Sequence, residues 1–96
     1  MAKGADLGDS LLKDSSTYDS LSALNKHDLL FTTATSHTLE GTNNVRAIDL
    51  YKQCLDVADQ SNDQAVTKGL DDQIINKGYI YNNLGMTQFM DFINET

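Results

Sequence analysis

The strongest helical pattern of the chain lies in residues 45–58, VRAIDLYKQCLDVA. Its apolar and small side chains recur every three or four positions, at Val45, Ile48, Tyr51, Leu55 and Ala58. This spacing places them on one face of an α-helix, with charged and amide side chains on the other faces. The segment therefore predicts a long amphipathic helix. The pattern leaves open whether residues 59–64 break this helix or lie within it.

A turn is expected immediately before this helix. Residues 40–44, EGTNN, combine a glycine with residues that favour turns and cap a following helix. Further upstream, the capping residues 14–17, DSST, predict a second helix that begins near Ser16 or Thr17 and runs to about His37. Residues 31–38 are rich in β-branched side chains, which weakens this helix and leaves a short strand as the alternative.

The C-terminal segment, residues 79–93, is the most aromatic part of the chain. Residues 76–78, Asn-Lys-Gly, precede it and are typical of a helix C-terminus, because lysine complements exposed carbonyls and glycine adopts the closing conformation. Within 79–93 the apolar side chains fall on two neighbouring faces of a helix. Two apolar faces on one terminal helix exceed what one thin core requires, so the pattern predicts a helix with a surface to spare for a partner.

These segments together predict the fold class. The chain contains no proline, which removes the commonest helix breaker. We expect an all-α fold, as a helical hairpin or a small bundle of three to four helices. Residues 1–10 are small and polar and are expected to form a flexible N-terminus. Residues 11–96 are expected to form a single helical domain.

Composition excludes several classes of function. The 96 residues carry a net charge of -7, and the few basic residues are isolated, which argues against binding to nucleic acid or to anionic membranes. A single cysteine excludes an intrachain disulfide framework. No run approaches the roughly 20 apolar residues that insert across a bilayer. We expect the chain to be cytoplasmic, or exported without a cleaved signal peptide.

The sequence contains no pattern that predicts catalysis. His27 and His37 lack the spacing of a metal-binding pair, and both are expected at the surface. The glycines do not form a phosphate-binding loop. Cys54 lies near the apolar stripe and is expected to be a small buried thiol, so a catalytic hypothesis would require it to be exposed and reactive. We therefore expect no enzymatic activity, no cofactor and no metal ion.

Two segments resemble helices of the tetratricopeptide repeat. Residues 47–55 resemble its second helix, with Ala47, Tyr51 and Cys54 at its small, aromatic and small positions. Residues 81–85, YNNLG, resemble the opening of its first helix. The resemblance implies packed helical hairpins. Each match covers one helix, and the two lie too far apart for one 34-residue period.

A second resemblance concerns the middle of the chain. Residues 39–41, Leu-Glu-Gly, take nearly the place of the central Trp-x-Gly turn in the WXG100 class of small secreted helical hairpins, which have about this length. The resemblance implies a two-helix hairpin that leaves the cell without a cleaved signal. The tryptophan and the C-terminal export motif of that class are missing, and we assign the chain to neither family.

The function expected from these features is protein–protein interaction, as an adaptor, chaperone or regulator. The partner is expected to be another protein or a second copy of the chain, bound through the large side chains of the terminal helix: Tyr79, Tyr81, Phe89, Met90, Phe92 and Ile93. The alternative for these residues is that they close the protein's own core. Alternative functions are a structural or secreted helical subunit that self-assembles or pairs with a related chain, and an acidic inhibitor of a nucleic-acid enzyme.

Overall fold

The computed structural model describes residues 3–41, 43–70 and 74–95 of the chain. Within these ranges there are five helices and no strand. The helices are α1 (Lys3–Lys13), α2 (Ser15–Ser20), α3 (Ala23–Glu40), α4 (Asn44–Lys68) and α5 (Gly78–Glu95). The structure thus confirms the predicted all-α fold. None of the described helices is long and apolar enough to cross a membrane.

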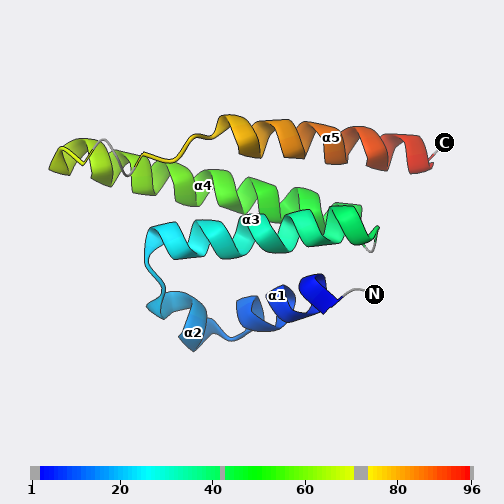
Figure 1. The fold of residues 1–96 in the computed structure, drawn as a ribbon, viewed down its shortest axis with the longest axis horizontal. Helices are drawn as coiled ribbons and strands as arrows, with labels where there is room; N and C mark the ends of the chain where they lie inside the picture. The colour runs from blue at the N-terminus through cyan, green and yellow to red at the C-terminus, as the bar shows by residue number, and fades with distance from the viewer. Residues whose placement is uncertain (1–2, 42, 71–73, 96) are drawn as a thin grey trace.

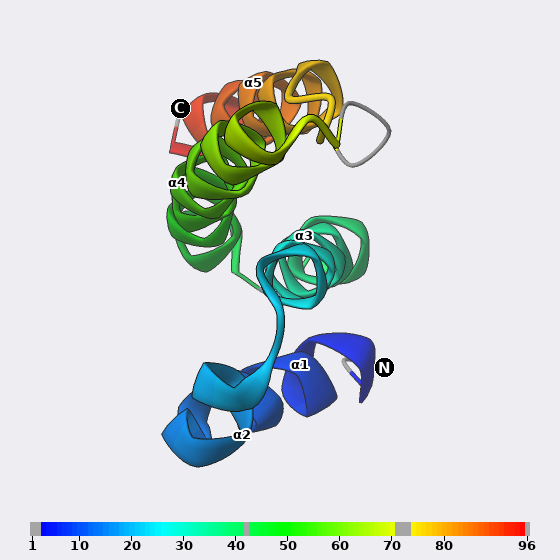
Figure 2. The ribbon, with the colours of Figure 1, turned by 90° about the vertical axis from the view of Figure 1, so that its left-hand side faces the viewer.

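The helices are stacked in a row, in the order α1, α3, α4, α5 (Figure 1). Neighbours in the row run antiparallel, and the resulting slab measures 46 × 28 × 15 Å. Figure 2 looks along the helices and shows α4 set to one side of the line that joins α3 and α5. The helices form a single row, so α4 is covered by a helix on two sides. The helix α5 lies at the end of the row and has a described neighbour only on its inner side.

The core follows the middle of this row along α4. Its fully buried small residues are Ala47, Cys54 and Ala58, and between them lies the aromatic ring of Tyr51. Small side chains allow neighbouring helices to approach closely, and the ring of Phe31 in α3 packs edge-on against Tyr51 at 5.7 Å. Of the stripe predicted from sequence, Tyr51 and Ala58 are buried, Ile48 and Leu55 are partly buried, and Val45 is exposed. The buried face is therefore shifted from the predicted stripe toward Ala47, Leu50 and Cys54, because two helices rather than one cover α4.

The helix predicted from residue 16 or 17 to about 37 is divided in the structure. Leu21 and Ser22 have extended backbones, and the Ser22 hydroxyl accepts a hydrogen bond from the backbone N–H of Asn25, which begins α3. Asp14 caps the short α2 in the same way, by accepting from the N–H of Thr17. The separate caps at Asp14 and Ser22 thus produce two helices where the sequence pattern predicted one.

The segment 31–38, for which a strand was the alternative, is helical. Three of its four threonines occupy packing positions, and only Thr32 is exposed. Thr33 is buried, and the Thr35 hydroxyl forms a hydrogen bond of 2.9 Å with the Tyr51 hydroxyl in α4. Thr38 donates to the backbone carbonyl of Ala34. Contacts with neighbouring helices therefore outweigh the low helix propensity of β-branched residues.

Residues 59–64 lie within α4, which continues unbroken to Lys68. The helix ends at Gly69, whose φ of 70° is the left-handed closing conformation favoured by glycine. The prediction of a helix C-terminus at residues 76–78 was wrong, because Gly78 begins α5. Asn76 accepts a hydrogen bond from the N–H of Gly78, so it serves the start of a helix.

The N-terminal segment is helical from Lys3 onward, and the first two residues of the predicted flexible N-terminus lie outside the described residues. Its flexibility stays a prediction. Gly8 of α1 is buried against Thr33 of α3, and a Cβ at Gly8 would stand 2.8 Å from the Cβ of Thr33. This distance is too short for two side chains, so α1 can approach α3 this closely only with glycine here.

Candidate protein-binding surface

The position of α5 is fixed before the helix begins. The side-chain amide of Asn62 in α4 donates to the carbonyl of Ile75 at 3.0 Å and accepts from its N–H at 2.6 Å. Two residues later, Lys77 forms an ion pair with Asp59, also in α4. This pairing raises the pKa of the Lys77 ammonium. The chain is thus attached to α4 by both backbone and charge before it enters α5.

The inner side of α5 is held by apolar contact and one hydrogen bond. Ile80 and Leu84 are buried in the core cluster. Thr87 is fully buried, and its hydroxyl lies 3.0 Å from the hydroxyl of Thr38 in α3. These residues recur every three or four positions, so they fall on one side of the helix and determine which side faces outward.

The opposite side, here called the outer face of α5, contains the six residues proposed from sequence. All six are exposed, with exposed fractions between 39% and 70%: Tyr79, Tyr81, Phe89, Met90, Phe92 and Ile93. At about 100° per residue, Phe89 is opposite Ile80, with Tyr81 and Phe92 on one flank and Tyr79 and Met90 on the other. The structure therefore brings the six together on one helix but divides them between two flanks.

The outer face is uncharged. Among residues 78–93 the only charged residue is Asp91, which is partly buried on the inner side. A helix that is apolar on nearly all sides is ordinarily covered on all of them. In a chain with a net charge of -7, an uncharged and largely apolar half-helix stands out as the surface best suited to lose its water.

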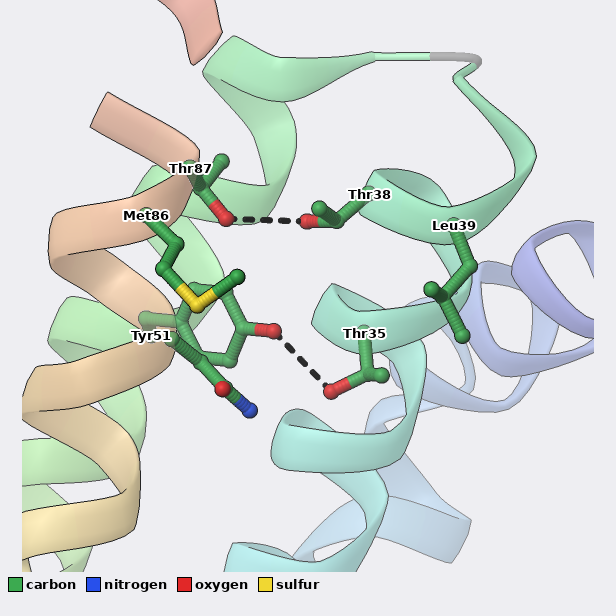
Figure 3. A pocket seen from close by; sticks show the side chains of 7 residues that line it. Thr35, Thr38, Leu39, Tyr51, Met86 and Thr87 are labelled. Carbon is green, nitrogen blue, oxygen red and sulfur yellow. Dashed lines mark hydrogen bonds between the residues drawn. The ribbon is translucent and has the colours of Figure 1, made fainter. Parts of the chain in front are cut away.

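A shallow cavity lies between α3 and one flank of α5 (Figure 3). Tyr51 of α4 lies at its base. The cavity is lined by Thr35, Thr38, Leu39, Tyr51, Asn83, Met86 and Thr87. Its hydroxyl groups are paired with each other, Tyr51 with Thr35 and Thr38 with Thr87, so their hydrogen-bonding demand is met within the protein. What the cavity offers a partner is mainly apolar contact.

Two apolar side chains beside this cavity were not among the proposed site residues. Met86 is 57% exposed, and Leu39 at the end of α3 is 81% exposed, the highest fraction among the large apolar residues described. Met86 shares the apolar pattern of the terminal segment, so its spacing was a sufficient signal. Leu39 precedes the turn, and only the packing of α3 beside α5 reveals that it borders the same surface.

The remaining candidate groups serve structure. Cys54 is fully buried, as predicted, its thiol donates to the backbone carbonyl of His27, and burial raises its pKa to about 12. It is therefore protonated and inaccessible at neutral pH. The prediction that both histidines lie at the surface was wrong for His37. That ring is buried and lies 2.8 Å from the carboxylate of Asp9, which also accepts from Arg46.

The described residues contain no group of three or more histidine, cysteine, aspartate or glutamate side chains that could hold a metal ion. Comparisons with protein-family models, with curated proteins and with solved structures returned no match for this chain. The likenesses to the tetratricopeptide repeat and to the WXG100 class thus remain resemblances.

Proposed function

We propose that this protein is an interaction module that docks on another protein through the outer face of α5. The observation that carries this proposal is that one uncharged half of the helix surface is exposed along its length. Three aromatic rings lie on it, Phe89 at its centre and Tyr81 and Phe92 on one flank. Aromatic residues dominate the energetics of protein interfaces because each loses a large apolar area to the partner at little cost in entropy. The methionines beside them supply adaptable contact.

The main alternative for these side chains is closure of the protein's own core. That role requires burial, whereas Phe89 and Phe92 are each 63% exposed. The core cluster uses the other side of the same helix, through Ile80 and Leu84. Covering the outer face is worth roughly 1.5–3 kcal/mol for each large apolar side chain that becomes fully buried. Burial of a few of these residues offsets a substantial part of the cost of association.

A photoreactive amino acid placed at position 89 tests the proposal in an extract of the source cells. We expect cross-linked products from position 89 that disappear when Phe92→Ala is added. The same group at Val66, which is 63% exposed on α4, is the matched control and should give no such product. Equal products from positions 89 and 66 would contradict the proposal.

Helix content provides the accompanying control for folding. Because Phe89 and Phe92 are exposed, Phe89→Ala and Phe92→Ala together should leave the circular dichroism of the chain nearly unchanged while removing association. Loss of helix content in this double variant would show that the two rings close the core. The interface would then lie elsewhere on the molecule.

A further inference from the structure

The outer face of α5 is ordered symmetrically about Gly85. Tyr81 lies four residues before Gly85 and Phe89 four residues after it, while Gly78 lies seven before and Phe92 seven after. At about 100° per residue these five positions fall within roughly 80° of the helix circumference. They therefore form one stripe along the helix, here called the outer stripe, whose centre is a glycine.

This order is complementary to itself when two copies meet antiparallel. If two outer stripes cross at Gly85, Tyr81 of one copy faces Phe89 of the second, and the large Phe92 faces the small Gly78. A parallel pair would instead place Phe92 against Phe92 and Gly78 against Gly78, which overfills one end and leaves the other empty. Both arrangements are two-fold, and only the antiparallel one places a large residue against a small one at both ends of the contact.

The glycine at the centre of the stripe, Gly85, is not explained by packing within the chain. A Cβ added at Gly85 would meet no atom within 4 Å, so nothing in the described fold requires glycine there. Glycine inside a helix is destabilising by roughly 0.5–1 kcal/mol relative to alanine. Another helical glycine of the chain, Gly8, has a clear packing role: because it has no side chain, α1 can approach Thr33 of α3 closely. Gly85 likewise has no side chain that would keep another helix at a distance, but no described helix of the same chain packs against it.

We infer that α5 pairs antiparallel with α5 of a second copy of this chain, with the two helices crossing at Gly85. This inference rests on the proposed function, because it names the occupant of the same surface. An 18-residue helix is about 27 Å long, so the pair buries on the order of 1,000 Å² in total, near the lower limit for specific interfaces. The expected product is a reversible dimer with a dissociation constant in the micromolar range.

Charge gives the dimer a distinctive salt response. Each copy carries a net charge of -7, while the outer stripe itself has no charged residue. Salt screens the repulsion between the two bodies and leaves the apolar contact intact. Association with a second copy should therefore strengthen as salt rises, whereas association with a basic partner should weaken.

Sedimentation velocity of the full chain over a concentration series, at low and high salt, tests the inference. We expect concentration-dependent dimers that are favoured by salt. Gly85→Leu should weaken dimerisation at least tenfold without loss of helix content, because the site is open and leucine favours helix. Gln60→Leu, at an exposed position of α4, is the control and should dimerise like the unaltered chain.

Disulfide trapping tests the register. In a Cys54→Ala background, a mixture of Tyr81→Cys and Phe89→Cys chains should form a mixed disulfide under mild oxidation. Neither variant alone should cross-link, because two copies of position 81, or of position 89, are about 12 Å apart in the antiparallel pair. Cross-linking of either variant with itself would overturn the antiparallel register.

The possible failures can be told apart. A chain that remains monomeric at all concentrations and salt conditions overturns the dimer, as does a dimer unaffected by Gly85→Leu. If cross-links from position 89 to another protein persist in that case, the proposed docking function stands with a different partner. If those cross-links are absent as well, both proposals fail.

Discussion

The side-chain amide of Asn62 forms both a donated and an accepted hydrogen bond with the backbone of Ile75, thirteen residues further along the chain. The side-chain amide thus satisfies both the N–H and the C=O of this peptide segment, as a neighbouring backbone would. It fixes the chain between α4 and α5, at a point where Ile75 enters the core. The orientation of α5, and therefore of its outer face, depends on this contact.

Replacing Asn62 by alanine should lower the free energy of unfolding by about 2 kcal/mol, since two hydrogen bonds are lost and a partly buried peptide group is left without its partners. Urea denaturation followed by circular dichroism measures this change. Gln60→Ala, at an exposed position of the same helix, should alter stability by less than about 0.5 kcal/mol. Equal effects of the two substitutions would show that the contact does not form in solution.

The carboxylate of Asp9 attaches α1 to the α3–α4 hairpin, through His37 at 2.8 Å and Arg46 at 3.2 Å. Asp9→Asn should weaken this attachment and speed hydrogen exchange in residues 6–13, with a loss of roughly 1–3 kcal/mol. Asp6→Asn removes the same charge from an exposed position of α1 and is the matched control. Identical exchange in the two variants would contradict the assigned role of Asp9.

Gly8 and Gly85 predict opposite effects of one substitution. Gly8→Ala should destabilise the protein by about 1–3 kcal/mol, because the new Cβ collides with Thr33. Gly85→Ala should stabilise the monomer by up to about 1 kcal/mol, because the site is open and alanine favours helix. Thermal and urea unfolding at concentrations below dimerisation measure both. Changes of the same sign would contradict the packing described for α1.

Cys54 predicts a loss of stability at alkaline pH. Burial raises the pKa of its thiol from 9.0 to about 12, so the folded state retains a proton that the unfolded state releases. The stability that the protonated thiol contributes to the folded state is fully present below pH 9 and is lost as the pH rises toward 12. Burial also raises the pKa of Tyr18, and the pairing with Asp59 raises that of Lys77, so both groups titrate in the alkaline range. Urea unfolding from pH 8 to 10.5 should show a steeper decline in stability for the unaltered chain than for Cys54→Ala, and the difference isolates the effect of the thiol.

Thiol reactivity gives an independent check on the same residue. At neutral pH, Cys54 should react with a thiol reagent only as fast as the fold opens, so the rate should rise sharply with urea. Rapid reaction of the folded chain would show that the thiol is exposed. It would also restore the catalytic hypothesis that burial of Cys54 now disfavours.

Much of the candidate site was predictable from residues 79–93, because aromatic spacing along one helix is a local property. The sequence could not show which flank of α5 faces α4, or that Leu39 borders the same cavity, since both depend on how separate helices pack. It also misplaced His37, because its partner Asp9 is 28 residues away, in a segment expected to be flexible.

The sequence by itself determined the helical character of this chain. Periodicity, cap residues and the absence of proline act within one or two helical turns, and they favour helix along α3, α4 and α5 despite the β-branched residues 31–38 of α3. The break at Leu21 and Ser22 is also a local outcome, because the Ser22 side chain caps the start of α3. Only the tertiary structure decided the continuity of α4 through residues 59–64 and the exposure of the outer face of α5. Those outcomes depend on contacts between residues far apart in the chain, whose energies exceed the local preferences that they override.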